Sequence, residues 1–161
     1  MADKKTDNYE VISKNKKATH DYFVHEEFEA GIMLEGSEVK SLRLNGCNLR
    51  DSHADVIVSG GNEEIYLMNL HIPEYKNAGA FNHKPNRHRK LLLHKREIKK
   101  LLGKKEQKGF TLIALVIYFN HKGYVKLKLG LCKGKTKSDK RETIKQKDWD
   151  RQKHRELKNN L

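Results

Sequence analysis

Val125-Lys126-Leu127-Lys128-Leu129 is the stretch of sequence that decides the fold, because every second residue in it is apolar. Such alternation is typical of a β-strand that packs one face on a core and turns the other to solvent. The strand then runs through Gly130-Leu131-Cys132-Lys133-Gly134-Lys135 into a tail crowded with Lys and Arg. A folded body that ends in a long basic arm is suited to binding polyanions.

Four other segments carry strand patterns. Residues 110–119 precede the quoted strand across a turn that contains Asn and Gly, which predicts a hairpin. Residues 56–58 and 65–72 flank a Gly-Gly turn and predict a second hairpin. Residues 20–32 predict the first strand. The apolar run Leu91-Leu92-Leu93 fits either a buried strand or the start of a helix, and periodicity alone does not decide between them.

Two short helices are predicted between these strands. The first covers residues 36–44, with Ser37 as its N-cap and a Gly after its last turn. The second covers about residues 94–102, where apolar residues recur at helical spacing, and Gly103 is expected to end it.

The fold class that follows is mainly β: a small oligonucleotide-binding (OB)-type β-barrel with two or three flanking short helices and a basic C-terminal tail. We expect a flexible N-terminal lead-in over residues 1–17, because it has few apolar residues. The RNA-binding barrel is predicted over residues 18–135. Residues 136–161 are predicted to form the tail, disordered in the free protein because the segment holds too few apolar residues for a core.

Composition favours a nucleic-acid partner. The chain has 161 residues and a formal charge of +13, from 34 basic and 21 acidic residues. The longest apolar run, residues 112–119, is too short to span a bilayer, and residues 1–17 contain no apolar secretory segment. Two distant cysteines, in no metal-ligand spacing, predict reduced thiols in a cytoplasmic protein.

Two basic clusters are candidates for phosphate binding. Between residues 84 and 108 only two Glu residues oppose the positive charge. The basic cluster in this segment is therefore expected to bind phosphate, with a merely solvent-exposed surface as the alternative. It consists of Lys84, Arg87, His88, Arg89, Lys90, Lys95 and Arg96. The second is Lys133-Gly134-Lys135, where Gly allows close backbone approach, with an ordinary strand-ending turn as the alternative.

Enzymatic interpretations find little support. No His residue lies in a strong metal or catalytic motif, and there is no standard Gly-rich nucleotide loop. No catalytic residue, metal ligand or cofactor is therefore predicted. Two other interpretations of a basic nucleic-acid-binding chain stay open: a ribosomal or assembly protein with a basic tail, and a ribonuclease that uses a His pair such as His71 and His94.

Seven short motifs occur in an order that closely resembles the small protein B family, the bacterial tmRNA-binding (SsrA-binding) proteins. The resemblance runs from about residue 15 into the tail. The motifs are Asn15-Lys16-Lys17-Ala18, Phe28-Glu29-Ala30-Gly31, Glu38-Val39-Lys40-Ser41-Leu42-Arg43, Asn48-Leu49-Arg50-Asp51, Arg89-Lys90-Leu91-Leu92-Leu93, the segment from Gly130 to Lys135, and Asp139-Lys140-Arg141.

The resemblance implies an OB-type barrel with extra helices and a cytoplasmic role in trans-translation, the rescue of stalled ribosomes. It implies binding to the tRNA-like domain of tmRNA, in the place of the missing anticodon arm. The tail is implied to enter the empty messenger channel, near the small-subunit RNA of the decoding centre, and to become helical there. Alanyl-charged tmRNA is implied to arrive with elongation factor Tu.

Site residues combine the two kinds of inference. Asn15, Glu29 and Leu92 match family positions implicated in tmRNA binding, and Glu29 could either accept hydrogen bonds from RNA or form a structural salt bridge. The full RNA-binding set is Asn15, Lys16, Lys17, Glu29, Arg87, Arg89, Lys90, Leu92, Lys133, Gly134 and Lys135. The ribosome-engaging tail set is Asp139, Lys140, Arg141, Ile144, Lys145 and Trp149.

Overall fold

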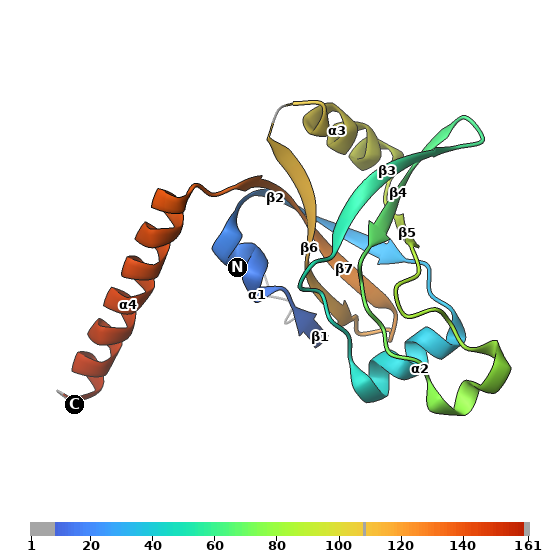
Figure 1. Ribbon diagram of the computed structural model, residues 1–161, viewed down its shortest axis with the longest axis horizontal. Coiled ribbons are helices and arrows are strands. Elements are labelled where there is room, and N and C mark those ends of the chain that lie inside the picture. The colour runs from blue at the N-terminus through green and yellow to red at the C-terminus, as the bar shows by residue number, and fades with distance from the viewer. Residues whose placement is uncertain (1–8, 108, 160–161) are drawn as a thin grey trace, which may run out of the picture.

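A seven-stranded antiparallel sheet forms the centre of the computed structural model, which describes residues 9–107 and 109–159 (Figure 1). The strand order is β1-β6-β3-β4-β5-β2-β7, and β6 also pairs with β7. The strands are β1 (Glu10–Lys14), β2 (Tyr22–Ile32), β3 (His53–Ser59), β4 (Asn62–Met68), β5 (Arg89–Leu92), β6 (Phe110–Phe119) and β7 (Val125–Gly134). The helices are α1 (Lys16–Asp21), α2 (Gly36–Asn45), the 3₁₀ segment η1 (Lys76–Phe81), α3 (Lys95–Lys105) and α4 (Lys137–Asn159).

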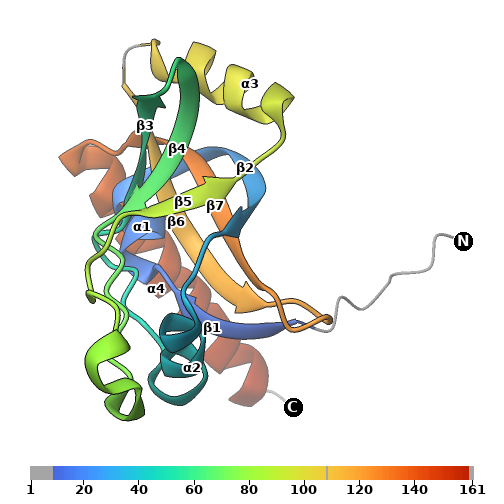
Figure 2. The ribbon, with the colours of Figure 1, turned by 90° about the vertical axis from the view of Figure 1, so that its right-hand side faces the viewer.

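The pairings of β2 to β7 run in a closed circuit. β6 pairs with β7, β7 with β2, β2 with β5, β5 with β4, β4 with β3, and β3 returns to β6. The two ends of β6 have different partners on its second edge, since β3 pairs with it near Leu112 and β1 pairs with it from Val116 to Phe119. The sheet is therefore strongly curved around one core (Figure 2).

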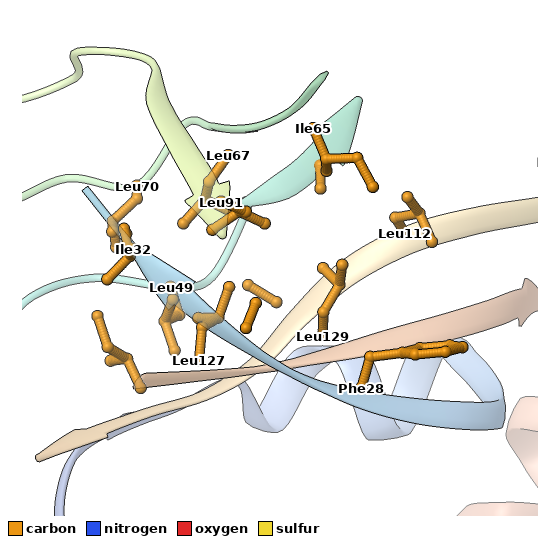
Figure 3. Close-up of a cluster of buried hydrophobic side chains, with 14 of the residues drawn as sticks. Phe28, Ile32, Leu49, Ile65, Leu67, Leu70, Leu91, Leu112, Leu127 and Leu129 are labelled. Carbon is orange, nitrogen blue, oxygen red and sulfur yellow. The ribbon is translucent and has the colours of Figure 1, made fainter. Parts of the chain in front are cut away.

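The core lies inside this curve, and β7 shows why the sequence folds this way. Leu127, Leu129 and Leu131 are fully buried, whereas Lys126 and Lys128 are on the outward face of the strand. Figure 3 shows Leu127 and Leu129 converging with Phe28, Leu112 and residues of β4 and β5. Each fully buried Leu contributes about 1.5–3 kcal/mol relative to exposure. The strand predicted from alternation at residues 125–129 is confirmed.

The predicted helices are present, with different ends. α2 begins at Gly36 because the Glu38 carboxylate accepts the backbone N–H of Glu35, which makes Glu35, not Ser37, its N-cap residue. α3 continues through Gly103 to Lys105, since Gly103 keeps a helical backbone there and does not adopt the positive φ of a terminating glycine. The ambiguous apolar run lies at the end of β5, so its first part is a strand.

The sequence predicts a flexible lead-in over residues 1–17, but the structure has regular secondary structure from Glu10 onward. Residues 1–8 lie outside the described part of the chain. Residues Glu10–Lys14 form β1, held by backbone pairing to β6. The next residues form α1, which Asn15 caps and which buries Ala18. Composition did not predict β1 because strand pairing through the backbone needs few apolar side chains. It did not predict α1 because this short helix is fixed by the Asn15 cap and buries only Ala18.

The tail predicted over residues 136–161 is described as far as Asn159, and its disorder in the free protein stays a prediction. Residues Lys137–Asn159 form α4, which projects away from the sheet and buries none of its side chains (Figure 1). Its start is capped: the Asp139 carboxylate accepts from both the N–H and the hydroxyl of Thr136, and the Asp139 N–H donates back to the hydroxyl. None of the described helices is long and apolar enough to cross a membrane.

Two glycines of β7 give a matched test of the packing. A Cβ at Gly130 would lie 2.7 Å from Leu115 Cδ1 and 3.0 Å from Cys132 Sγ, whereas one at Gly134 meets no atom within 4 Å. Gly130→Ala should lower the free energy of unfolding by about 1–3 kcal/mol because it overpacks the interior. Gly134→Ala should change it by less than about 0.5 kcal/mol. Urea denaturation measures both, and equal effects would contradict this packing.

Candidate nucleic-acid interface

Arg89, expected to contact phosphate, lies in the interior. Its side chain has no exposed surface, and its Nε donates to Glu38 Oε1 at 2.7 Å. Its Nη1 donates to the carbonyl of Leu70 at 2.7 Å, and its Nη2 to that of Pro85 at 3.0 Å. Because each guanidinium nitrogen is bonded inside the protein, Arg89 has no surface to offer RNA. This corrects the role expected from the charge run.

Arg87 shares the same carboxylate. Its Nη2 lies 2.7 Å from Glu38 Oε2, and its side chain is about one-third exposed. Burial alone would raise the pKa of Glu38, but hydrogen bonds from the two arginines and from the Glu35 N–H outweigh it and hold that pKa below its ordinary value. The basic run therefore has a compensating carboxylate that comes from α2, far away in the sequence.

Lys90 is also paired. Its Nζ lies 2.6 Å from Glu64 Oε1, and the Tyr66 hydroxyl donates to the other oxygen of Glu64 at 3.0 Å. The hydrogen bond between Lys90 and Glu64 lowers the pKa of Glu64, and the same bond raises the pKa of Lys90. Both side chains remain partly exposed, so this pair lies at the surface and can exchange partners with a ligand.

Glu29 and Leu92, far apart in the sequence, line one groove. β2 and β5 are adjacent, and Gly31 of β2 stands opposite Leu92 of β5. The groove has a volume of about 1050 Å³ and is bounded by β2, β5, the β3–β4 hairpin and the start of α3. Lys90 and Lys126 line it as well. The structure thus brings together three residues of the predicted set and adds Lys126.

The outward face of β7 explains that addition. Lys126 and Lys128 alternate with the buried leucines, and they stand in register with Gly31 and Glu29 of β2. Glu29 is exposed and accepts a hydrogen bond from the Tyr118 hydroxyl. Among the described residues no cation lies within 4 Å of its carboxylate, so the salt bridge considered for Glu29 is not formed. The alternation in the sequence was the signal that could have identified Lys126.

A second basic region lies at the end of β7. Lys133 is exposed, its Nζ lies 4.6 Å from the centroid of the Phe110 ring, and no described carboxylate comes within 4 Å of it. Lys135 is used differently: its Nζ donates to the carbonyl of Thr19 and to the hydroxyl of Thr143. It therefore joins the end of β7 to α1 and α4. Gly134 between them is exposed.

α1 places two lysines beside this region. Asn15 itself is buried: its Nδ2 donates to the carbonyls of Leu49 and Ala114, and its Oδ1 accepts from Ala18 N–H. With these atoms occupied, Asn15 fixes the start of α1 and does not reach the surface. Lys16 and Lys17 are exposed. Lys17 pairs with Asp51 at 3.1 Å, and its side chain remains 45% exposed.

The tail residues lie on a helix that touches the body only at its start. Lys140 pairs with Asp21 of α1 at 3.3 Å, while Asp139 caps the helix. Beyond this first part the side chains face solvent. Exposed members of the predicted tail set are Arg141, Ile144, Lys145 and Trp149.

Catalytic chemistry is not indicated by the described residues. Within them, no group of three or more His, Cys, Asp or Glu residues could hold a metal ion. His94 stands at the N-cap of α3, and His71 Nδ1 lies 3.2 Å from Asn86 Oδ1. Burial raises the pKa of Cys47 to about 12, so its thiol is a poor nucleophile at neutral pH.

Comparison with known proteins gives consistent matches. The family model described as SmpB protein matches residues 12–159. An SsrA-binding protein of Ruegeria pomeroyi is 50% identical over 99% of this chain and 99% of its own length. One from a Wolbachia strain of Drosophila simulans is 53% identical over 94% of this chain and 99% of its own length.

One solved structure is similar to the chain over most of its length. It is described as "tmRNA-SmpB: a journey to the center of the bacterial ribosome". The sequences are 47% identical and the TM-score is 0.63, over 82% of this chain and 93% of the other.

Removing the Glu38 carboxylate should destabilise the protein. Glu38→Ala leaves Arg89 buried without a counter-charge and should lower the free energy of unfolding by about 3–5 kcal/mol. Glu64→Ala breaks the partly exposed pair with Lys90 and should cost about 1 kcal/mol or less. Chemical denaturation of both variants makes the comparison, and similar losses would contradict the structural role of Glu38.

The same carboxylate should confer acid sensitivity. Folding lowers the pKa of Glu38, so its carboxylate stabilises the protein at pH values above the pKa that it has in the unfolded chain. This contribution is lost as the pH falls through the lower pKa that Glu38 has in the folded protein. Glu38→Gln lacks this titration. The stability advantage of the wild type over Glu38→Gln should therefore shrink as the pH drops below about 4.3. A constant difference from pH 7 to pH 3 would contradict the assignment.

Proposed function

The chain belongs to the SmpB protein family, and from this premise we propose that it binds tmRNA and brings it to stalled ribosomes for trans-translation. The observation that carries the proposal is likeness over nearly the whole length to proteins named for SsrA binding. A similar solved chain, described with tmRNA, SmpB and the bacterial ribosome, supports both partners. The protein acts as a non-enzymatic adaptor in the cytoplasm.

The body is proposed to be an OB-type barrel. Support comes from the closed circuit of pairings between β2 and β7 and from the apolar side chains that fill its interior. Barrels of this type bind nucleic acid on an outer face and through neighbouring loops. The groove beside β2 and β5 lies on such an outer face.

This groove is proposed to hold the tRNA-like domain. Leu92 is half exposed and offers an apolar platform for a ribose or base. Lys126 and Lys90 provide positive charge for phosphate, with Lys90 able to leave Glu64 as RNA approaches. The Glu29 carboxylate, oriented by Tyr118, can accept hydrogen bonds from base amino groups or a 2′-hydroxyl.

The end of β7 is proposed to extend the RNA surface. Lys133 and Gly134 would approach the phosphate backbone together with Lys16 and Lys17 of α1. Other members of the predicted set are given positioning roles, because their polar atoms are bound within the protein. These are Asn15, Arg87, Arg89 and Lys135.

The tail, residues 136–161, is proposed to engage the ribosome in the empty messenger channel, near the small-subunit RNA of the decoding centre. Its side chains are exposed from Ile144 to Asn159, so the helix presents both cations and the Trp149 ring to a partner. We propose that its order in the free protein is lower than on the ribosome. Elongation factor Tu is proposed as the carrier of the charged tmRNA in the delivery complex.

Replacing Lys133 should weaken RNA binding in a salt-dependent way. Lys133→Gln removes one phosphate contact, so the affinity for the tRNA-like domain should fall and the slope of log K against log salt should decrease by about 1. Titrations in excess tRNA, across a salt series, measure both quantities. Lys122→Gln, an exposed lysine at the opposite end of β7, is the matched control and should leave the slope unchanged.

Truncation after Lys135 should separate the two surfaces. Because α4 buries none of its side chains, the shortened chain should bind the tRNA-like domain with an affinity within about threefold of the full chain. Tagging of proteins on stalled ribosomes should be lost. Loss of RNA binding in the truncated form would contradict the two-surface proposal.

A further inference from the structure

Phe81 is an aromatic side chain exposed at a loop tip. With 92% of its surface accessible, it is the most exposed of the large hydrophobic side chains in the described residues. It ends η1, between β4 and β5. None of the roles proposed for the groove, the end of β7 or the tail uses it. Because a Phe side chain stabilises a fold through its burial, a ring this exposed contributes little to folding and is accessible to a partner.

The loop that carries Phe81 is firmly held. Asn82 Oδ1 accepts from Tyr75 N–H at 3.1 Å, and Asn82 Nδ2 donates to Tyr75 O at 2.9 Å, which closes the loop across its base. The buried His83 ring contacts Ser37 Oγ at 2.9 Å and the carbonyl of Ile72 at 3.0 Å. A loop with a fixed base loses little conformational entropy when its tip binds.

The surroundings of Phe81 favour a nucleic acid over a protein. Its sequence neighbours Asn77, Gly79 and Ala80 are small or polar. Lys76 and Lys84 of the same loop are exposed, and no described carboxylate lies within 4 Å of either Nζ. An isolated aromatic ring among unpaired lysines is the combination that stacks on a base while phosphates are neutralised.

We propose that Phe81 stacks on an unpaired base of tmRNA, forming an RNA contact separate from the groove. The inference rests on the proposed function. In Figure 1 the loop lies beside α2 at the lower right, whereas α4 extends to the left and α3 lies at the top. Since the tail is the part proposed to engage the ribosome, the loop on the far side of the body is assigned to tmRNA.

The test compares four side chains at one position, using a fluorescently labelled tRNA-like domain and the full-length protein. Phe81→Ala should weaken binding by about 5- to 150-fold, the range found for loss of one stacked base. Phe81→Trp should stay within about twofold of wild type because it keeps a ring face. Phe81→Leu should resemble Phe81→Ala, since an aliphatic side chain cannot stack. The salt slope should be unchanged in all four, because no phosphate contact is removed.

Controls separate the possible failures. Tyr124→Ala removes another exposed ring, 66% accessible and in the β6–β7 turn, and should bind as wild type does. Wild-type affinity in Phe81→Ala or in Phe81→Leu would overturn the stacking proposal. If Phe81→Ala binds tmRNA normally but no longer supports tagging, the base that Phe81 contacts belongs to the ribosome. That result would overturn the proposal that Phe81 stacks on tmRNA. If the wild-type chain itself fails to bind the tRNA-like domain, the proposed function falls, and this inference with it.

Discussion

The buried Glu38 carboxylate, held between the guanidinium groups of Arg87 and Arg89, fixes the part of the structure that carries two of the proposed RNA contacts, the groove and the Phe81 loop. Arg89 also donates to the carbonyls of Leu70 and Pro85, so one side chain joins α2 to the residues on either side of the η1 loop. The loop that carries Phe81 is thus anchored at both ends. β5, which starts at Arg89, forms a wall of the groove.

Pairing divides the many basic residues into two groups with different uses. Arg87 and Arg89 are neutralised by Glu38 and serve the fold, whereas Lys133 and Lys126 project from β7 with no described carboxylate within 4 Å. A guanidinium group that is shielded from solvent must be paired with a carboxylate, because the free-energy cost of burying an isolated charge is larger than the stabilisation that packing provides. The positive charge available to a polyanion therefore includes the outward face and end of β7, α1 and α4, together with Lys84, Lys95 and Arg96 of the basic cluster, which are exposed.

The sequence predicted the elements whose signal is local. Alternation in β7 and the hairpin turns identified strands and their inward faces, and the resemblance identified the groove residues Glu29 and Leu92. The sequence did not predict that Arg89 is buried, because Glu38, the partner of Arg89, lies on another element. A run of basic residues has the same sequence pattern whether its side chains face the interior or the solvent. β1 was missed because it is held by backbone bonds to β6, which leave no side-chain pattern. α3 passes Gly103 because a glycine ends a helix only where the chain must turn.

The short link between β7 and α4 couples the two proposed surfaces. Lys135 holds the carbonyl of Thr19 and the hydroxyl of Thr143, and Lys140 pairs with Asp21, so the first turns of α4 are oriented by α1. Beyond these contacts the helix is stabilised by its own backbone and capping, which is marginal in water without a packed face. RNA bound beside Lys133 would therefore lie next to the residues that orient the tail.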